Sequence, residues 1–376
     1  MYEHIKEITF KITSYCNLKC TYCFQKPETK ETDNCFNDFK SLRKFVSGLP
    51  LSDYVEFKIT GGESSLYPDR IRSAYKELKK IERENPVRCI FSTISNGTNM
   101  QILIDLMDDG ILHPDYCKIS YDGIYSASKS RLVKFDKYQD PDQYFNNQIK
   151  ILGNSKYRDR VLIRTALTNE TIDNLDESLK FILSTGCRKW EYYYISDYEN
   201  YKNPSFIKKF IDKLNKIVDI YNKTPFNFYN ITSYKYFMNH QDKDYRLTKC
   251  RHLGRFLYIG TDGKIYPCGY FSPDGYYSEE RFEIGDIYNG FNQERIKAFA
   301  EEYEQKPSCS IASDKKCKLY HCFECPAVSH YRKKHMMHRL QQQCIMRGIE
   351  HGIFREIEDL YFDNETIDKI MTPYNQ

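Results

Sequence analysis

The sequence has few of the features that mark membrane, secreted or nucleic-acid-binding proteins. No stretch approaches 18 consecutive apolar residues, and the N-terminal "MYEHIKEITFKI" lacks the charged and apolar regions of a secretion signal. The 56 Lys and Arg nearly balance the 52 Asp and Glu, and a net charge of +4 is too small to favour binding through phosphate contacts. We therefore expect a globular cytoplasmic protein that binds small molecules, peptides or proteins, and neither membranes nor nucleic acids.

Ten of the fourteen cysteines, by contrast, form two groups. Three lie within eight residues near the N-terminus, and seven follow position 249. Because we expect a reducing compartment, clustered thiols indicate metal binding more than disulfides. The four outside both groups are interpreted as small buried side chains, namely Cys35, Cys89, Cys117 and Cys187.

The first half of the chain alternates short apolar runs with helical patterns, which is typical of a parallel sheet with crossover helices. One such helical pattern is "DRIRSAYKELKKIERE". The pattern predicts an α/β fold, a partial (β/α)6 TIM-like barrel over residues 1–240, with its chemistry on the loops that follow the strands. The six predicted strands cover residues 7–12, 54–60, 87–94, 116–121, 161–167 and 189–195.

The pattern changes near residues 235–245, where we place a domain boundary. Residues 241–376 are expected to form a second, cysteine-rich domain that ends in a C-terminal helix. Within it, "GRFLYIGTDGKIYPCGYF" predicts two strands joined by a turn at Asp262 and Gly263, because Asp-Gly is a strong hairpin signal.

The N-terminal cysteines lie in "SYCNLKCTYCF", directly after the first predicted strand. Cys16, Cys20 and Cys23 can ligate three irons of a 4Fe-4S cluster and leave the fourth iron open. A structural zinc ion is the alternative, but zinc sites of this kind normally have four ligands, and no obvious fourth lies in the loop.

This spacing resembles the signature of the radical S-adenosylmethionine (SAM) superfamily, with an aromatic residue, here Tyr22, before the last cysteine. The resemblance implies that SAM chelates the open iron, and that reduction of the cluster cleaves SAM to a 5′-deoxyadenosyl radical. It also implies that Tyr22 contacts the adenine.

Segments after the next three strands resemble further SAM contacts of that family. For Asn96 and Asp122 a turn or helix-cap role is an equal alternative. The resemblance implies that the glycine-rich segment, Gly61, Gly62 and Glu63, receives the methionine amino group, and that Ser95 and Asn96 contact the ribose. It also implies a further cofactor segment at Ser120 and Asp122, and an arginine for the carboxylate at Arg131.

The seven later cysteines resemble the SPASM extension of some radical SAM enzymes, which binds two auxiliary iron-sulfur clusters. The order of ligands is kept, but the middle spacing, C-x7-C-x4-C-x2-C, departs from the family pattern. A single auxiliary cluster, or zinc on part of the set, is the alternative. The inner cluster has three assigned thiols, and its fourth site is either open or filled by a non-cysteine residue, for which His252 is one candidate. The full set is Cys250, Cys268, Cys309, Cys317, Cys322, Cys325 and Cys344.

Relatives with this extension chiefly modify peptides or proteins and take electrons from donors such as flavodoxin or ferredoxin. The resemblance therefore implies an enzyme that oxidatively modifies a ribosomally made peptide, for example by a side-chain crosslink. The alternatives are oxidation of a Cys or Ser in a sulfatase, or iron-sulfur or zinc binding without turnover. Gly269 stands at the position where sulfatase-maturing relatives carry an aspartate that acts as a base. Glu191 and Tyr193 are candidates for the substrate pocket.

Overall fold

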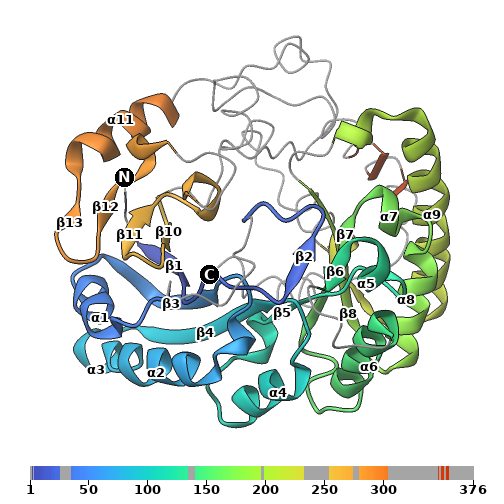
Figure 1. Ribbon diagram of the computed structural model, residues 1–376, viewed down its shortest axis with the longest axis horizontal. Helices are drawn as coiled ribbons and strands as arrows, with labels where there is room; N and C mark the ends of the chain where they lie inside the picture. The colour runs from blue at the N-terminus through green and yellow to red at the C-terminus, as the bar shows by residue number, and fades with distance from the viewer. Residues whose placement is uncertain are drawn as a thin grey trace.

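The computed structural model describes an arc of parallel strands lined on its outside by helices (Figure 1). The described residues are 2, 4–25, 35–133, 140–195, 199–232, 254–273, 279–303, 346, 349–350 and 353–354.

All six predicted strands are present and pair in parallel, which confirms the predicted partial barrel. A further short strand, β9, extends the arc at one edge. Along the arc the strands are β1 (Ile5–Lys11), β3 (Leu51–Thr60), β4 (Arg88–Ser95), β5 (Lys118–Ser120), β7 (Leu162–Leu167), β8 (Lys189–Tyr194) and β9 (Asn227–Phe228).

The helices cover the outer face of this sheet because alternate strand residues present apolar side chains to them. Phe57 of β3 and Phe91 of β4 stack with ring centroids 5.3 Å apart, and Tyr75 packs edge-on against Phe91. The α-helices of the barrel are α1 (Phe39–Ser47), α2 (Pro68–Leu78), α3 (Ile81–Glu84), α4 (Met100–Asp108), α5 (Ser126–Lys129), α6 (Pro141–Gly153), α7 (Asn169–Ile172), α8 (Leu175–Ser184) and α9 (Pro204–Lys223).

The predicted hairpin forms at Asp262 and Gly263, where the positive φ of Gly263 (78°) suits glycine. Its first strand also pairs in parallel with β1, so the barrel sheet continues into the C-terminal region as one sheet of eleven strands. The predicted boundary at 235–245 lies almost wholly outside the described residues. The elements here are β10 (Phe256–Ile259), β11 (Lys264–Tyr266), β12 (Gly285–Asp286), β13 (Gly290–Phe291) and α11 (Gln293–Tyr303).

Short elements complete the description. Two strands, β2 (Leu18–Cys20) and β6 (Arg131–Val133), pair outside the main sheet. Five 3-10 turns lie in the connections, at η1 (Ser64–Leu66), η2 (Pro114–Tyr116), η3 (Glu199–Lys202), η5 (Gly269–Phe271) and η6 (Glu280–Phe282).

Three of the four cysteines outside the two groups are buried as predicted, at Cys89, Cys117 and Cys187. The prediction for Cys35 is wrong: its side chain is only half-buried, because it lies beside Arg70, whose Nη1 is 2.6 Å from the sulfur.

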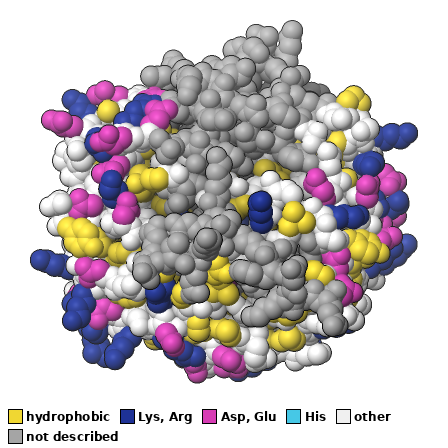
Figure 2. Space-filling view, viewed as in Figure 1, with side chains coloured by type: hydrophobic (Ala, Val, Ile, Leu, Met, Phe, Trp, Pro, Cys, Tyr) yellow, Lys and Arg dark blue, Asp and Glu magenta, His cyan; other side chains and the backbone are white. Residues whose placement is uncertain are grey.

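In the described part of the chain, no helix is long and apolar enough to cross a membrane. On the face shown in Figure 2, side chains of both signs alternate around the rim, in keeping with the near-balanced composition.

Candidate functional site

The first cysteine group lies on the loop between β1 and α1, at the end of the barrel where the strands finish. Its middle section is β2, which pairs with β6 so that Cys20 lies opposite Arg131. Beyond β2 the chain turns, and the Cys23 amide donates to the Cys20 carbonyl at 3.2 Å. A segment more than a hundred residues further along the chain therefore holds this loop in place.

The three thiols lie in a largely buried environment. Burial is the main cause that raises the pKa of Cys16 to about 11 and of Cys20 to about 12, and the nearby Cys23 adds to both shifts. The sulfur of Cys16 accepts hydrogen bonds from the Leu18 amide at 3.4 Å and from Asn96 Nδ2 at 3.7 Å.

Within the described residues, no three Cys, His, Asp or Glu side chains converge closely enough to hold a single metal ion. The donor set still fits an iron-sulfur cluster, because three thiols on one loop with N–H donors to sulfur are the ligands and outer contacts that such clusters use.

The glycine pair after β3 packs directly on the cysteine loop. The Gly62 amide donates to the Thr13 carbonyl, and the Glu63 amide to the Tyr15 carbonyl, both at 2.9 Å. A Cβ added at Gly62 would lie 2.2 Å from the Tyr15 oxygen, and one at Gly61 would lie 2.7 Å from the Thr13 oxygen. Glycine is needed here because the two backbones touch.

The carboxylate of Glu63 is buried and accepts three hydrogen bonds. Its donors are the Ser65 amide at 3.0 Å, Ser95 Oγ at 2.8 Å and the Asn96 amide at 2.6 Å. Glu63 therefore joins the segments that follow β3 and β4, two of the predicted cofactor segments.

Asp122, which follows β5, likewise joins its own segment to the cysteine loop and to β7. One oxygen accepts from the Tyr22 hydroxyl and from Ser130 Oγ, and the other from the Ala166 amide at 3.0 Å. The ring of Tyr22 is partly exposed, but burial of its hydroxyl beside Asp122 raises the pKa of the tyrosine well above its ordinary value. Asp122 therefore helps to hold these segments together, and its contact with the cofactor stays a prediction.

Arg131 lies buried in the centre of these contacts. Its guanidinium donates to the Ser120 carbonyl and, at 2.9 Å, to the Asn96 carbonyl, while its buried Nε has no hydrogen-bond partner among the described residues. Burial disfavours its charge, but the neighbouring Tyr22, Cys20 and Asp122 raise its pKa above the ordinary value. The orphan N–H is a donor that a carboxylate ligand can use, which fits the predicted role.

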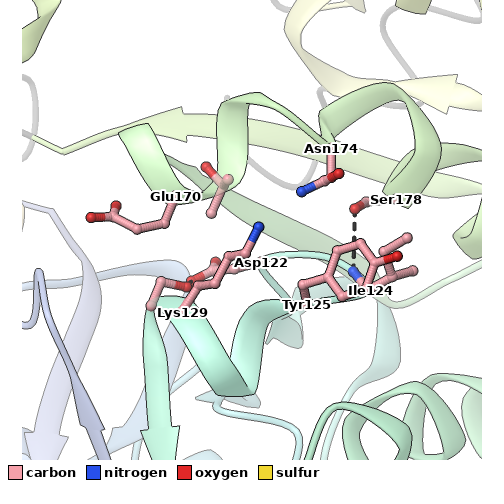
Figure 3. Close-up of a pocket in the computed structure, with 9 residues that line it drawn as sticks. Asp122, Ile124, Tyr125, Lys129, Glu170, Asn174 and Ser178 are labelled. Atoms are coloured by element: carbon pink, nitrogen blue, oxygen red, sulfur yellow. Dashed lines mark hydrogen bonds between the residues drawn. The ribbon is translucent and has the colours of Figure 1, made fainter.

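Behind Asp122 is a small polar cavity, just large enough for about one water molecule. Figure 3 shows Asp122 and Lys129 on one side and Glu170, Asn174 and Ser178 on the other. Ser178 Oγ also accepts a hydrogen bond from the Ile124 amide at 3.3 Å, and this bond fixes the loop after β5 against α8.

Of the nine predicted SAM contacts, Tyr22 lies on the cysteine loop, Arg131 lies on β6 opposite Cys20, and the other seven lie at the ends of β3, β4 and β5. Cys268, at the end of the hairpin, is half-buried near Tyr2, and two residues later Tyr270 packs on Phe24 with ring centroids 4.6 Å apart. The hairpin therefore contacts the first cysteine loop. The other predicted ligands lie outside the described residues, at Cys250, Cys309, Cys317, Cys322, Cys325 and Cys344.

Two charged residues were missed by the sequence interpretation. Lys118 of β5 and Arg164 of β7 lie on the inner face of the barrel, near Glu191 and Tyr193, the two residues predicted as candidates for the substrate pocket. The signal for both was present in the sequence, as a single charged residue inside an apolar strand run.

A family model described as the radical SAM superfamily matches residues 10–182, which contain the three thiols and all nine residues above. This match assigns residues 10–182 of the chain to a radical SAM domain. An uncharacterised protein of Methanocaldococcus jannaschii is 23% identical over 270 residues, 71% of this chain and 86% of its own. GTP 3′,8-cyclase of Chlorobaculum tepidum is 24% identical over 132 residues, 35% of this chain and 37% of its own.

Solved radical SAM structures share the fold. The sulfatase-maturating enzyme anSMEcpe with bound AdoMet has a TM-score of 0.71 and 16% identity, and the match covers 99% of each chain. Streptococcus suis SuiB bound to S-adenosylmethionine has a TM-score of 0.54 and 16% identity, over 90% of this chain and 75% of SuiB. Likeness at this identity shows the radical SAM partial barrel.

Proposed function

We propose that this radical SAM enzyme oxidatively modifies a peptide substrate and belongs to the subgroup with a SPASM-type extension. The observation that carries the proposal is the loop of three thiols packed on the Gly61 and Gly62 backbone, with Arg131 opposite Cys20. Further support comes from anSMEcpe and SuiB, which have been solved with peptides bound and share the fold over most of this chain.

In this proposal Cys16, Cys20 and Cys23 hold a 4Fe-4S cluster, and the segments after β3, β4 and β5 hold SAM. When bound, the pair supplies a carbon-centred radical that abstracts hydrogen, with electrons from an external donor such as flavodoxin or ferredoxin. The chain's own contribution is position: Glu63 and Asp122 each join two of the loops by accepting three hydrogen bonds.

We further propose that the later cysteines bind auxiliary clusters, two if the full set is used. The contact between Phe24 and Tyr270 supports a site near the first cluster, because it brings the Cys268 segment onto the first cysteine loop. A single cluster, or zinc on part of the set, is the alternative. Such clusters are stable in a reducing, oxygen-poor cytoplasm, where we place the protein.

Sulfatase-type oxidation of one Cys or Ser is the second candidate function, favoured by the fold likeness to anSMEcpe. Gly269 argues against it, because glycine supplies no base after Cys268, and a Cβ added there would lie 3.1 Å from the Tyr258 ring. A sulfatase peptide that gains formylglycine on incubation with the enzyme would favour this candidate over crosslinking.

The test is anaerobic reconstitution followed by iron and sulfide counting and an assay of 5′-deoxyadenosine. About twelve irons per chain are expected for three clusters, and about four fewer for Cys16→Ala/Cys20→Ala/Cys23→Ala, which should form no 5′-deoxyadenosine. Cys187→Ala, a buried thiol outside both groups, is the control and should retain both. Zinc with negligible iron, or SAM cleavage by the triple variant, would refute the proposal.

A further inference from the structure

Asn17 lies between the first two cysteines of the cysteine loop and is not among the predicted cofactor contacts. Its half-buried side chain contacts two residues of the segment that follows β4. Asn17 Oδ1 accepts a hydrogen bond from Asn96 Nδ2 at 2.8 Å, and Asn17 Nδ2 donates one to Thr98 Oγ1 at 3.0 Å. These two bonds connect the cysteine loop to the β4 segment through side chains.

The side chains of Asn17, Asn96 and Thr98 form a closed ring of hydrogen bonds. The hydroxyl of Thr98 donates to Asn96 Oδ1 at 2.7 Å, and the backbone amide of Thr98 donates to the same oxygen at 2.9 Å. Because a backbone N–H can only donate, the atom that it contacts must be the oxygen of the Asn96 amide, and the nitrogen must face the other way. The direction of the remaining bonds in the ring follows from that contact.

The nitrogen of Asn96 therefore faces the cysteine loop. One of its hydrogens is donated to Asn17 Oδ1, and the sulfur of Cys16, 3.7 Å from the nitrogen, accepts the other. A side-chain amide has two donor hydrogens and two oxygen lone pairs, and the contacts to Asn17, Cys16 and Thr98 use all of them. The hydrogen bonds of this side chain are thus directed at Cys16 and the ring.

The backbone of Asn96 is fixed as well. Its amide donates to the Glu63 carboxylate at 2.6 Å, and its carbonyl accepts from Arg131 at 2.9 Å. Asn96 is buried, so the remaining freedom of its side chain is rotation of the terminal amide. Rotation away from Cys16 would break the bond to Asn17, and the position of the N–H on the sulfur therefore depends on Asn17.

We propose that Asn17 is a positioning residue: it keeps the Asn96 N–H on the sulfur of Cys16, and this contact raises the reduction potential of the cluster held by the three thiols. A cluster-bound thiolate is negatively charged, so the N–H stabilises it. The stabilisation is greatest in the reduced cluster, which holds the one electron supplied by the external donor. The proposal rests on the proposed function, because it requires that Cys16 ligates a cluster.

The test is a redox titration of the anaerobically reconstituted full chain, followed by electron paramagnetic resonance (EPR) without SAM. The first cluster is identified separately, as the one whose reduced EPR signal changes when SAM is added. Asn96→Ala removes the donor and should move the midpoint potential of this cluster to a more negative value. Asn17→Leu, which keeps a similar shape without polar atoms, should bind wild-type iron and give a shift of the same sign that is no larger.

A double variant shows whether Asn17 acts through Asn96. In Asn17→Leu/Asn96→Ala the donor is already absent, so the shift should equal that of Asn96→Ala alone, whereas independent effects would add. Asn230→Leu is the matched control, because Asn230 is also half-buried and its amide also makes two hydrogen bonds, both to the backbone of Tyr192 on β8. The control should leave the midpoint potential unchanged.

Two variants of Thr98 decide the question if Asn17→Leu binds less iron. Thr98→Val removes the hydroxyl that closes the ring and should also shift the midpoint potential to a more negative value. Thr98→Ser keeps the hydroxyl and should keep the wild-type potential. Equal potentials in this pair, additive shifts in the double variant, or a wild-type potential in Asn17→Leu with full iron would overturn the proposal.

Failure of this proposal is distinct from failure of the proposed function. A wild-type chain that binds no iron after reconstitution, or whose EPR signal does not respond to SAM, refutes the proposed cluster. A chain that binds the cluster and cleaves SAM, but whose midpoint potential is the same in Asn96→Ala, refutes only the role of this hydrogen bond.

Discussion

Replacing Gly62 with alanine tests whether contact between two backbones positions the cysteine loop. The added Cβ would lie 2.2 Å from the oxygen and 2.3 Å from the carbonyl carbon of Tyr15, and 2.7 Å from the Cys16 nitrogen. Carbon contacts are comfortable only near 3.5–4.0 Å, so the loop must move by more than about 1 Å. Neither partner is a flexible side chain that could turn away.

That movement has a cost that can be estimated. It breaks or stretches the bonds from Gly62 to Thr13 and from Glu63 to Tyr15, both 2.9 Å long, each worth about 0.5–1.5 kcal/mol. Overpacking adds about 1–3 kcal/mol. We therefore expect Gly62→Ala to lower the free energy of unfolding by roughly 2–6 kcal/mol. Because the displaced segment carries Cys16, the variant should also lose iron from the first cluster.

The assay is anaerobic urea unfolding of the metal-free chain, with iron counting after reconstitution. Gly48→Ala is the matched control, because Gly48 has an ordinary φ of −89° and its added Cβ would lie 3.5 Å from the Phe45 oxygen. The control should stay within about 0.5 kcal/mol of the wild type. A Gly62→Ala protein with full iron and wild-type stability would show that the loop is not held by this contact.

Three further predictions concern the buried polar groups. Asp122→Ala leaves the Tyr22 and Ser130 hydroxyls and the Ala166 amide without their acceptor, so the thermal midpoint should fall by an amount equivalent to roughly 2–4 kcal/mol. The half-buried Asp142 accepts from Ser128, and Asp142→Ala should cost only about 0.5 kcal/mol, so equal shifts would contradict the role of Asp122. The folded-state pKa of Lys118 is lowered to about 8, below its unfolded value, so between pH 8 and about pH 10 the unfolded chain binds more protons than the folded chain. The stability of the wild type relative to Lys118→Met should therefore rise with pH over this range. A difference in urea midpoints that stays constant with pH would refute this. The single tryptophan, Trp190, is fully buried and donates to Thr165 at 3.0 Å, so its fluorescence should be blue-shifted and move to the red as the barrel unfolds; red-shifted native emission would contradict this packing.

Local patterns were enough to predict the six strands. Each is a β-branched or aromatic run with one face against helices, and period-two alternation is a property of the segment itself. Strand ends differed by several residues: the fourth predicted strand, residues 116–121, has only Lys118–Ser120 in β5, because Tyr116 belongs to the preceding 3-10 turn. The predicted helix from Asp69 was likewise split into α2 and α3.

The features of the structure that the sequence did not predict depend on pairings between segments that are distant in the chain. Nothing in "SYCNLKC" indicates that Cys20 pairs with Arg131, because register between remote strands is decided by tertiary packing. The same holds for the hairpin. Its turn at Asp262 and Gly263 could be predicted from the sequence, but its pairing with β1 could not. An open barrel leaves an edge strand, and the segment that covers that edge is not encoded beside it.

The nine residues that resemble cofactor contacts are, in the structure, largely engaged with the protein itself. Glu63 and Asp122 each accept three hydrogen bonds, and Asn96 Oδ1 accepts from the Thr98 amide at 2.9 Å. A resemblance in sequence alone therefore does not separate a residue that touches a ligand from one that shapes the loop around it. The distinction has an energetic consequence, because loops already held by buried carboxylates lose little conformational freedom when a ligand binds. We therefore expect Glu63 and Asp122 to contribute to the affinity for SAM mainly by fixing the backbone of their loops. Arg131 has a buried N–H with no hydrogen-bond partner among the described residues, and we expect this donor to serve the ligand.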